Sequence, residues 1–96
     1  MRFRYFREAL EEIREASLHY GEISERVRKR FHLAMSRALE EIGSYPQAWS
    51  KSIKGTRRRN LRRFPYTVVY QAKAEEIVII AVAHLARRQN YWRDRL

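Results

Sequence analysis

The residues that could do chemistry are concentrated in one short stretch of the chain. Five arginines lie within the seven positions 57–63, namely Arg57, Arg58, Arg59, Arg62 and Arg63. The planar guanidinium group donates paired hydrogen bonds to phosphate and to carboxylate, so the cluster predicts an anion-binding surface without naming the anion. Charged side chains also keep an exposed strand edge from pairing with other chains. Five arginines exceed what edge protection needs, and we therefore favour a binding surface.

The charge of the whole chain supports this interpretation. The net charge is +10, and it is unevenly divided: residues 1–48 carry nine basic and eight acidic side chains, whereas residues 49–96 carry twelve and three. A field of this kind attracts polyanions such as nucleic acid, or an acidic segment of another protein. The surface that meets a partner is therefore expected in the second half.

A histidine and two aromatic residues could extend this chemistry toward the C-terminus. His84 follows an apolar run and precedes the pair Arg87 and Arg88, and an imidazole there could donate a proton near neutral pH. We favour the structural interpretation, in which His84 caps a strand and bonds to the backbone. Tyr91 and Trp92 could stack on a nucleobase, although Trp92 is more typical of a residue that pins a chain end to the core.

Carboxylates that could act as a base are scarce in the second half. Beyond residue 48 the only acids are Glu75, Glu76 and Asp94. We expect Glu75 and Glu76 to lie in a turn at the opposite end of a strand from His84. This placement weakens any hydrolytic assignment that needs a carboxylate beside the histidine.

Composition limits the remaining possibilities. The 96 residues have room for one domain, which we place at 1–96. The chain has no cysteine, so disulfides and thiolate metal sites are excluded, and we expect neither a metal nor a cofactor. The longest apolar run, Ile77 to Ala83, is far shorter than the roughly 20 residues that cross a bilayer. We expect a cytoplasmic protein that does not bind membranes.

Hydrophobic periodicity predicts a strand and then two helices that must position these residues. Residues 1–6 alternate basic and aromatic side chains, which is typical of a short strand with Phe3 and Tyr5 on one face. Apolar residues then recur at helical spacing from Glu8, and Gly21 is expected to end that helix. A second stripe from Ile23 to Ile42 predicts a helix of about five turns that ends before Gly43. The two helices should form an antiparallel hairpin packed on a sheet.

The second half reads as strands. The segment 57–63 is too densely charged to be buried and fits an exposed edge strand. Residues 66–71 are rich in β-branched and aromatic side chains, and residues 74–76 read as a turn. Residues 77–83 are apolar without alternation, which predicts a central strand covered on both faces by the hairpin and by the chain end. Residues 90–95 are long enough for a short turn of helix at most.

Several separated motifs stand in a characteristic order along the chain. They are the loop Pro46-Gln47-Ala48-Trp49; residues 61–70, LRRFPYTVVY; residues 77–84, IVIIAVAH; and the pairs Arg87-Arg88 and Tyr91-Trp92. These motifs resemble the RelE/ParE toxins of bacterial type II toxin-antitoxin systems, also called plasmid stabilisation proteins, and the resemblance covers nearly the whole chain. It implies an α+β fold with an N-terminal strand, an antiparallel helical hairpin on a small, mostly antiparallel sheet, and a short C-terminal helical turn.

The resemblance also implies a function and a partner. It implies a growth-inhibiting toxin that a cognate antitoxin neutralises through an extended or helical segment laid over the basic surface. RelE-like members cut messenger RNA on the ribosome without a metal, whereas ParE-like members block DNA gyrase. We expect an acidic or amphipathic antitoxin segment across the arginine-rich strand.

The residues that the resemblance assigns to RNA cleavage are only partly present. Attack by a 2'-hydroxyl needs a proton acceptor, cations around the phosphate and an acid for the leaving oxygen. In RelE-like members, these three tasks are performed by lysine and arginine on the second and third strands. An arginine and a tyrosine near the C-terminus also take part in them. Alignment on Tyr66 places Arg58 at one lysine position, but Asn60 at the other and Thr67 at the strand arginine. Arg87 or Arg88, with Tyr91, could match the C-terminal pair.

We therefore favour a ParE-like toxin that binds DNA gyrase, and keep three alternatives. The first is a ribosome-dependent endoribonuclease that uses Arg58, His84, Arg87, Arg88 and Tyr91. The second is an inactive family member, and the third is a basic nucleic-acid-binding module. Under every binding interpretation the contact residues are the arginines at 57, 58, 59, 62, 63, 87 and 88.

Overall fold

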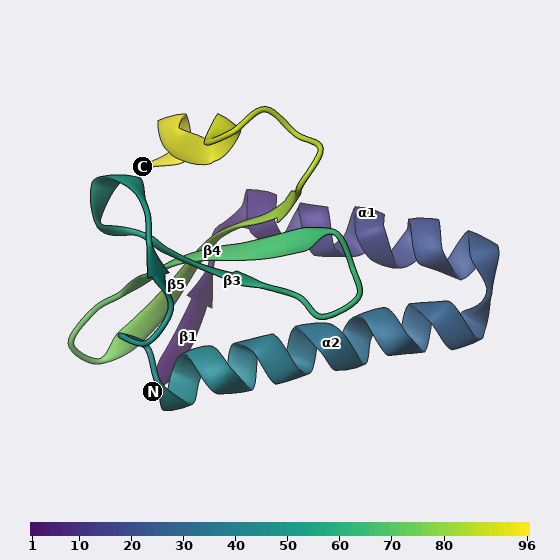
Figure 1. Ribbon diagram of the computed structural model, residues 1–96, viewed down its shortest axis with the longest axis horizontal. Coiled ribbons are helices and arrows are strands. Elements are labelled where there is room, and N and C mark those ends of the chain that lie inside the picture. The colour runs from purple at the N-terminus through teal and green to yellow at the C-terminus, as the bar shows by residue number, and fades with distance from the viewer.

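The computed structural model describes residues 1–96 as five strands, two α-helices and two 3-10 helices (Figure 1). In chain order these are β1 (Arg2–Tyr5), α1 (Arg7–Ile23), α2 (Glu25–Ser44), β2 (Ser50–Lys51), η1 (Ile53–Gly55), β3 (Arg57–Asn60), β4 (Tyr66–Ala72), β5 (Glu76–His84) and η2 (Tyr91–Arg95). The strand, helical hairpin, strands and terminal turn appear in the predicted order.

The strands form one sheet in the order β1-β5-β4-β3-β2. Strand β1 pairs with β5 in parallel, and every other pairing is antiparallel. The longest strand, β5, thus lies between β1 and β4, as expected for a strand that is apolar without alternation. A β-bulge between Val69 and Tyr70 interrupts its register with β4. The predicted α+β architecture with a mostly antiparallel sheet is confirmed.

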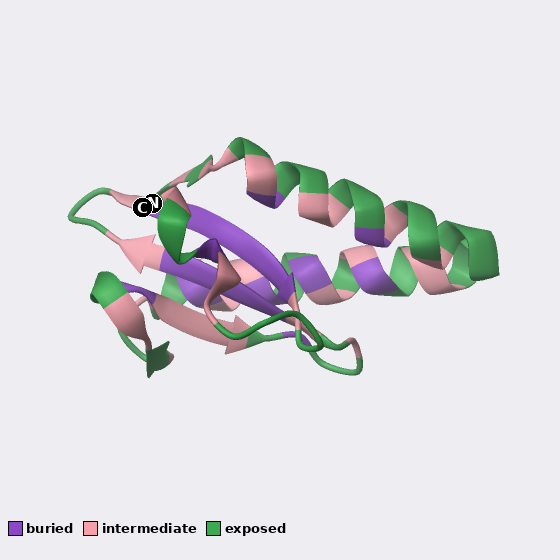
Figure 2. Cartoon of the chain, turned by 90° about the horizontal axis from the view of Figure 1, so that it is seen from above, coloured by how far each residue is buried: buried purple, intermediate pink, exposed green.

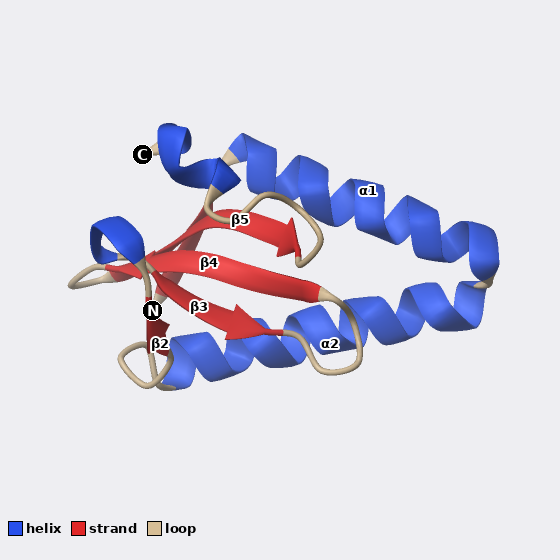
Figure 3. Ribbon diagram, turned by 45° about the horizontal axis from the view of Figure 1, so that its top comes forward, coloured by secondary structure: helices blue, strands red, loops and turns tan.

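The two α-helices lie antiparallel on one face of the sheet and extend beyond it, so that the longest dimension of the molecule is 39 Å (Figure 3). In α2 the buried residues Phe31, Met35, Ala38 and Ile42 recur every three or four positions and form one stripe. Figure 2 shows that the buried parts of both helices face the sheet, while their other faces are exposed. The stripe predicted from the sequence therefore builds the helix-side core.

The helix ends differ from the prediction. Helix α1 passes through Gly21 and ends at Ile23, because Ser24 starts the next helix: its hydroxyl oxygen accepts a hydrogen bond from the Val27 N–H at 3.1 Å. Ile23 is 61% exposed and does not belong to the α2 stripe. Helix α2 likewise includes Gly43, where a Cβ atom would lie 3.3 Å from the Phe3 ring. Gly43 thus allows close packing of helix on strand and does not end the helix.

The opposite face of the sheet is covered by the C-terminal segment. Trp92, in η2, is fully buried against Val69, Val78 and Ile80 of the two central strands. The expected role of Trp92 as a residue that pins the chain end to the core is confirmed, and β5 is covered on both faces as predicted. Figure 1 shows η2 lying apart from α2, across the sheet from it.

Strand β3 is shorter and less exposed than the predicted edge strand over 57–63. It ends at Asn60, and the short strand β2 pairs with Arg57 and Arg58, so β2 forms the true edge. The following residues form a turn, in which Leu61 donates to the carbonyl of Tyr66 at 2.9 Å. Arg63 adopts a left-handed backbone with φ of 66°, which is uncommon outside glycine.

Candidate functional site

Strand β3 directs its arginines to opposite sides of the sheet. Arg57 and Arg59 are register partners of Tyr70 and Val68, which belong to the helix-side core. Arg58 is the partner of Val69, which belongs to the core of the opposite face. Because neighbouring side chains on a strand alternate in direction, the cluster of arginines is divided between two surfaces.

Arg57 and Arg59 are held by polar groups on the helix side. Arg57 donates to the Trp49 carbonyl and to the Gln47 side chain, each at 2.8 Å. The Arg59 guanidinium lies 4.4 Å from the centre of the Trp49 ring and donates to Glu41 of α2 at 2.5 Å, with only 15% of its side chain exposed. The expectation of a single outward-facing arginine surface is wrong for these two. The loop after α2 supplies the carbonyl and amide oxygens that bind Arg57, and α2 itself supplies the carboxylate that binds Arg59.

On the opposite face, Arg58 joins the other candidate residues in a pocket of about 240 Å³, which we call the outer pocket. Its lining includes every residue proposed for catalysis: Arg58, His84, Arg87, Arg88 and Tyr91. These residues come from β3, from the end of β5, from the loop after it and from η2. The fold thus brings together side chains that are up to 33 positions apart in the sequence.

His84 bonds to the backbone, as the favoured interpretation predicted. Its Nδ1 atom accepts a hydrogen bond from the Ala86 N–H at 3.0 Å, and its ring packs edge-on against Tyr66 with centres 5.0 Å apart. A neutral imidazole that accepts at Nδ1 carries its proton on Nε2. His84 can therefore donate a proton from Nε2 but cannot accept one while this bond lasts.

The wall of the outer pocket is held by a carboxylate that the sequence analysis missed. Glu12 of α1 accepts hydrogen bonds from the Tyr91 hydroxyl, from Arg95 at 2.9 and 3.0 Å, and from the Val82 N–H at 3.0 Å. The Arg87 guanidinium in turn lies 3.9 Å from the centre of the Tyr91 ring. Glu12 lies three residues after Ala9 and four before Ala16, on the buried face of its helix. A carboxylate at such a position signals a partner.

Burial and hydrogen bonding shift the pKa values of this cluster in opposite directions. Burial alone would raise the pKa of Glu12, but the hydrogen bonds from Arg95, Tyr91 and the Val82 N–H outweigh burial and lower it. Burial, and the hydrogen bond to Glu12, raise the pKa of the Tyr91 phenol well above its ordinary value. Tyr91 therefore stays protonated, with its proton directed to Glu12 and not to the pocket.

Asn60 and Thr67, which align with a catalytic lysine and arginine of RelE-like members, lie in places unlike each other. Asn60 is exposed at the end of β3, on the same face as Arg58. Thr67 is fully buried, and its hydroxyl has no hydrogen-bond partner. A buried threonine cannot take the place of the strand arginine beside a phosphate.

The two remaining arginines of the cluster lie on the helix side. Arg62 and Arg63 line a groove of about 820 Å³ between α2 and the turn that follows β3, together with Arg30 and Arg37 of the helix. The sequence analysis did not single out Arg30 or Arg37, because basic residues on the exposed side of a helix are common. No group of three or more His, Asp or Glu side chains in the chain could hold a metal, and no helix is long and apolar enough to span a bilayer.

Comparison with known proteins identifies the family. Residues 3–90 match the family model described as "ParE toxin of type II toxin-antitoxin system, parDE". The chain belongs to the ParE toxin family. It is thus the toxin of a type II toxin-antitoxin system, and the expected RelE/ParE family is confirmed.

Solved structures of toxins share the fold at low sequence identity. A chain of the "Chromosomal ParDE TA system from P. aeruginosa" is 19% identical and superposes with a TM-score of 0.63, over 88% of this toxin and 96% of that chain. The isolated E. coli RelE toxin is 20% identical, with a TM-score of 0.62 over 98% of this toxin and 94% of that chain. These likenesses show that this toxin has the fold shared by ParE and RelE toxins, and the two TM-scores are too similar to favour one kind of toxin over the other. No curated protein matches significantly.

Proposed function

We propose that the toxin acts by binding, in the manner of ParE-like members, and that DNA gyrase is its target. One observation carries the proposal: the outer pocket collects cationic side chains and offers no group to accept a proton. Arg58, Arg87 and Arg88 supply guanidinium groups, which only donate hydrogen bonds, and no carboxylate lines the pocket. RNA cleavage by a 2'-hydroxyl needs such an acceptor, whereas recognition of an anionic surface does not.

The two remaining candidates for a base are both occupied. His84 accepts the Ala86 N–H at Nδ1, which leaves a protonated Nε2 facing away from that bond. The Tyr91 hydroxyl donates to Glu12, and its raised pKa keeps it neutral. This arrangement supports a binding surface rather than a catalytic centre.

The proposal includes a partner and a place of action. As a member of a toxin-antitoxin family, the chain has a cognate antitoxin. We propose that an acidic or amphipathic segment of it wraps around the β3 side of the sheet, from Arg62 and Arg63 on the helix side to Arg58 on the opposite face. We leave Arg57 and Arg59 out of this contact because the loop after α2 and Glu41 already bind them. Gyrase is a cytoplasmic enzyme, so we place the action of the toxin in the cytoplasm.

A supercoiling assay with purified gyrase tests the target. We expect the toxin to inhibit supercoiling, and the double variant Arg58→Glu/Arg87→Glu to lose inhibition, because both substitutions reverse charge in the outer pocket. The matched control is Arg14→Glu, an exposed charge reversal on α1 at a residue that does not line the pocket. Undiminished supercoiling at a large excess of folded toxin would count against gyrase.

One feature of the outer pocket, a protonated imidazole nitrogen beside three arginines, supports a second candidate, a ribosome-dependent endoribonuclease whose proton acceptor would have to come from outside the pocket. Arg58, Arg87 and Arg88 could bind a phosphate there, and the Nε2–H of His84 could protonate a leaving oxygen. Primer extension on translated messages should then show cuts that depend on the toxin and disappear with His84→Gln. Messages that stay intact while growth stops would exclude this candidate. Expression that leaves growth unaffected would instead indicate an inactive family member.

A further inference from the structure

Leu85 is an exposed apolar residue within a cationic surface. Its side chain is 51% exposed, and it begins the loop after β5, just ahead of Arg87 and Arg88. No other exposed large apolar side chain lines the outer pocket. Single exposed leucines are common on protein surfaces, so the meaning of this one depends on its surroundings.

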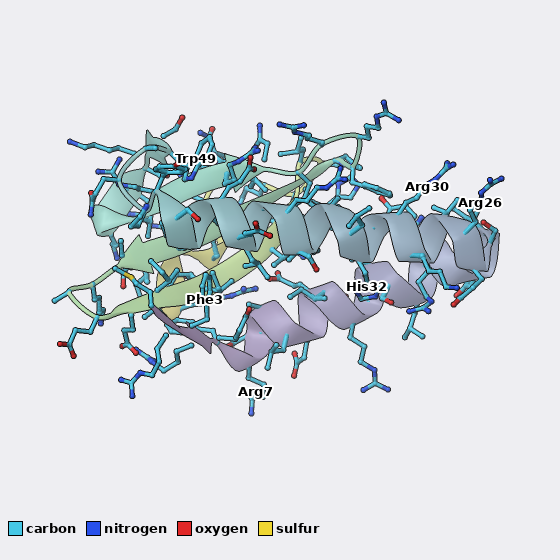
Figure 4. The ribbon with its side chains drawn as sticks, turned by 90° about the horizontal axis from the view of Figure 1, so that it is seen from below. Phe3, Arg7, Arg26, Arg30, His32 and Trp49 are labelled. Carbon is cyan, nitrogen blue, oxygen red and sulfur yellow. The ribbon has the colours of Figure 1, made fainter.

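Leu85 lies between two hollows of the surface. On one side is the outer pocket. On the other is a hollow of about 460 Å³, which we call the edge hollow, lined by Trp49, Ser50, Arg58, Arg59, Asn60 and Leu85. Only Arg58 and Leu85 line both. Figure 4 shows Trp49 near the carboxyl end of α2, far along that helix from Arg26 and Arg30 at its start. The leucine thus has a concave surface on either side, at the end of the molecule away from the helix turn.

The backbone at Leu85 is fixed by hydrogen bonds. The Leu85 N–H donates to the Pro65 carbonyl at 2.8 Å, which joins the loop to the turn before β4. The next two N–H groups, of Ala86 and Arg87, each donate to His84 at 3.0 Å, the first to Nδ1 and the second to the carbonyl. A side chain on a backbone that is already ordered loses less conformational entropy when it binds. His84, whose role is structural, therefore holds the leucine in a defined position.

Three arginines share the outer pocket with the leucine. Arg58, Arg87 and Arg88 form no ion pair within the chain. Guanidinium groups bind phosphate and carboxylate alike, so the arginines alone do not identify the partner. The leucine distinguishes the two, because a sugar-phosphate backbone offers it no apolar cavity. A protein surface, by contrast, can combine an apolar socket with a rim of Asp and Glu.

We infer that Leu85 is the apolar anchor of the target-binding surface, and that it enters an apolar socket rimmed by carboxylates on a protein subunit of gyrase. The inference rests on the proposed function and deepens it, because it makes a protein surface, and not the DNA that gyrase holds, the ligand of the outer pocket. Burial of the leucine supplies affinity, and the surrounding arginines supply the rate of association and the specificity. An apolar centre within a charged rim is the usual arrangement of a protein interface.

Calorimetric titration of purified gyrase with purified toxin, without DNA, tests the anchor. The test variant is Leu85→Ser, which removes the apolar side chain and keeps every charge. Leu85→Met returns an apolar side chain of similar volume. The matched control is Leu18→Ser, an exposed leucine of α1 that lines neither hollow. Circular dichroism and thermal unfolding verify that the variants fold like the wild type.

We expect Leu85→Ser to bind gyrase at least about 10-fold more weakly than the wild type and to inhibit growth less. Leu85→Met should recover most of the lost affinity, and Leu18→Ser should bind normally. The loss in Leu85→Ser should persist between about 0.1 and 0.5 M salt, because salt screens charges and does not weaken an apolar contact. The loss caused by Arg87→Glu should shrink over the same range.

Gyrase affinity in Leu85→Ser within about twofold of the wild type would overturn the anchor, and so would an equal loss of affinity for duplex DNA alone. Folded wild-type toxin that does not bind gyrase would instead refute the proposed function. The growth assay would then decide on the anchor by itself, because toxicity that Leu85→Ser leaves intact would overturn it.

Discussion

Glu12 and Arg95, 83 positions apart in the sequence, meet through two hydrogen bonds of 2.9 and 3.0 Å between the carboxylate and one end of the guanidinium group. The pair joins the first helix to the last segment of the chain. The same carboxylate also accepts a hydrogen bond from the Tyr91 hydroxyl, and the Arg87 guanidinium stacks on the Tyr91 ring. The position of the basic loop at the outer pocket therefore depends on a residue that lies outside the pocket.

Replacing Glu12 by Gln should destabilise the toxin by about 2–3 kcal/mol. The side chains of Glu12 and Arg95 are only 14% and 17% exposed, so the substitution leaves a poorly solvated arginine without its counter-charge. Urea unfolding measures the loss. The matched control is Glu11→Gln, which removes an exposed pair with Arg7 and should change the stability by less than about 0.5 kcal/mol. Equal effects of the two substitutions would contradict this role for Glu12.

Acid should destabilise the wild type more than the Glu12→Gln variant. The pKa of Glu12 is lower in the folded chain than its usual value of 4.5, so its contribution is fully present above that value. It is lost as the pH falls through the folded pKa, because the unfolded chain then binds the proton more readily. Unfolding free energies measured between pH 7 and pH 3 should therefore converge for the two proteins. Parallel curves would show that Glu12 does not titrate as proposed.

Tyr91 should make the largest single contribution to the loss of stability in alkali, although burial also raises the pKa values of Tyr5, Tyr20, Tyr66 and Tyr70. Burial, and the hydrogen bond to Glu12, raise its pKa above the usual 10.0, so the folded chain keeps a phenol proton that the unfolded chain loses. The stability contributed by Tyr91 is complete below pH 10 and declines as the pH rises toward the folded pKa. Tyr91→Phe should flatten this decline. In an absorbance titration of the folded proteins, the tyrosine that ionises at the highest pH in the wild type should be missing from the variant. A decline of unchanged slope would contradict the assignment.

Helices and strands that bury an apolar face could be predicted from the sequence. Hydrogen bonds and ion pairs between polar residues far apart in the chain could not. The stripe of Phe31, Met35 and Ile42 and the apolar run of β5 indicated the elements correctly, because apolar periodicity reflects the face that packs. The sequence also indicated five of the residues that line the outer pocket as candidates for one site, namely Arg58, His84, Arg87, Arg88 and Tyr91. Their arrangement follows from strand order, which brings the end of β5 beside β3 only through β4.

The division of the arginine cluster shows where sequence patterns stop being informative. Strand alternation already implies that Arg57 and Arg59 face the same way, but not that Gln47, Trp49 and Glu41 would meet them. The contacts with Gln47 and Trp49 depend on the path of the loop after α2, and the contact with Glu41 depends on how α2 packs beside β3. Glu12 was missed for the same reason, since its partners Tyr91 and Arg95 lie at the other end of the chain.

Alanine substitutions should therefore separate a structural arginine from a functional one. Arg59→Ala removes the Glu41 ion pair and the stacking on Trp49, and should lower the free energy of unfolding by about 1–2 kcal/mol. Arg58 forms no hydrogen bond or ion pair within the chain, so Arg58→Ala should leave stability within about 0.5 kcal/mol while toxicity falls. Thermal unfolding and growth inhibition, measured on the same preparations, give both readouts. The reverse pattern would refute the division of the cluster.

The continuous course of α1 through Gly21 predicts that Gly21→Ala stabilises the toxin. Alanine favours a helix interior over glycine by about 0.5–1 kcal/mol, partly because it restricts the unfolded chain. The new Cβ atom would lie 3.3 Å from the Cδ atom of Arg28, a half-buried side chain bound to Glu25, whose flexible stem can shift by a few tenths of an ångström while the ion pair is kept. The same substitution at Gly43 meets the rigid ring of Phe3 at 3.3 Å, so its helical gain should be reduced or reversed. Urea unfolding of the two variants side by side tests both expectations. If Gly21→Ala instead destabilised the chain, the first helix would have to end where the sequence pattern first placed its end.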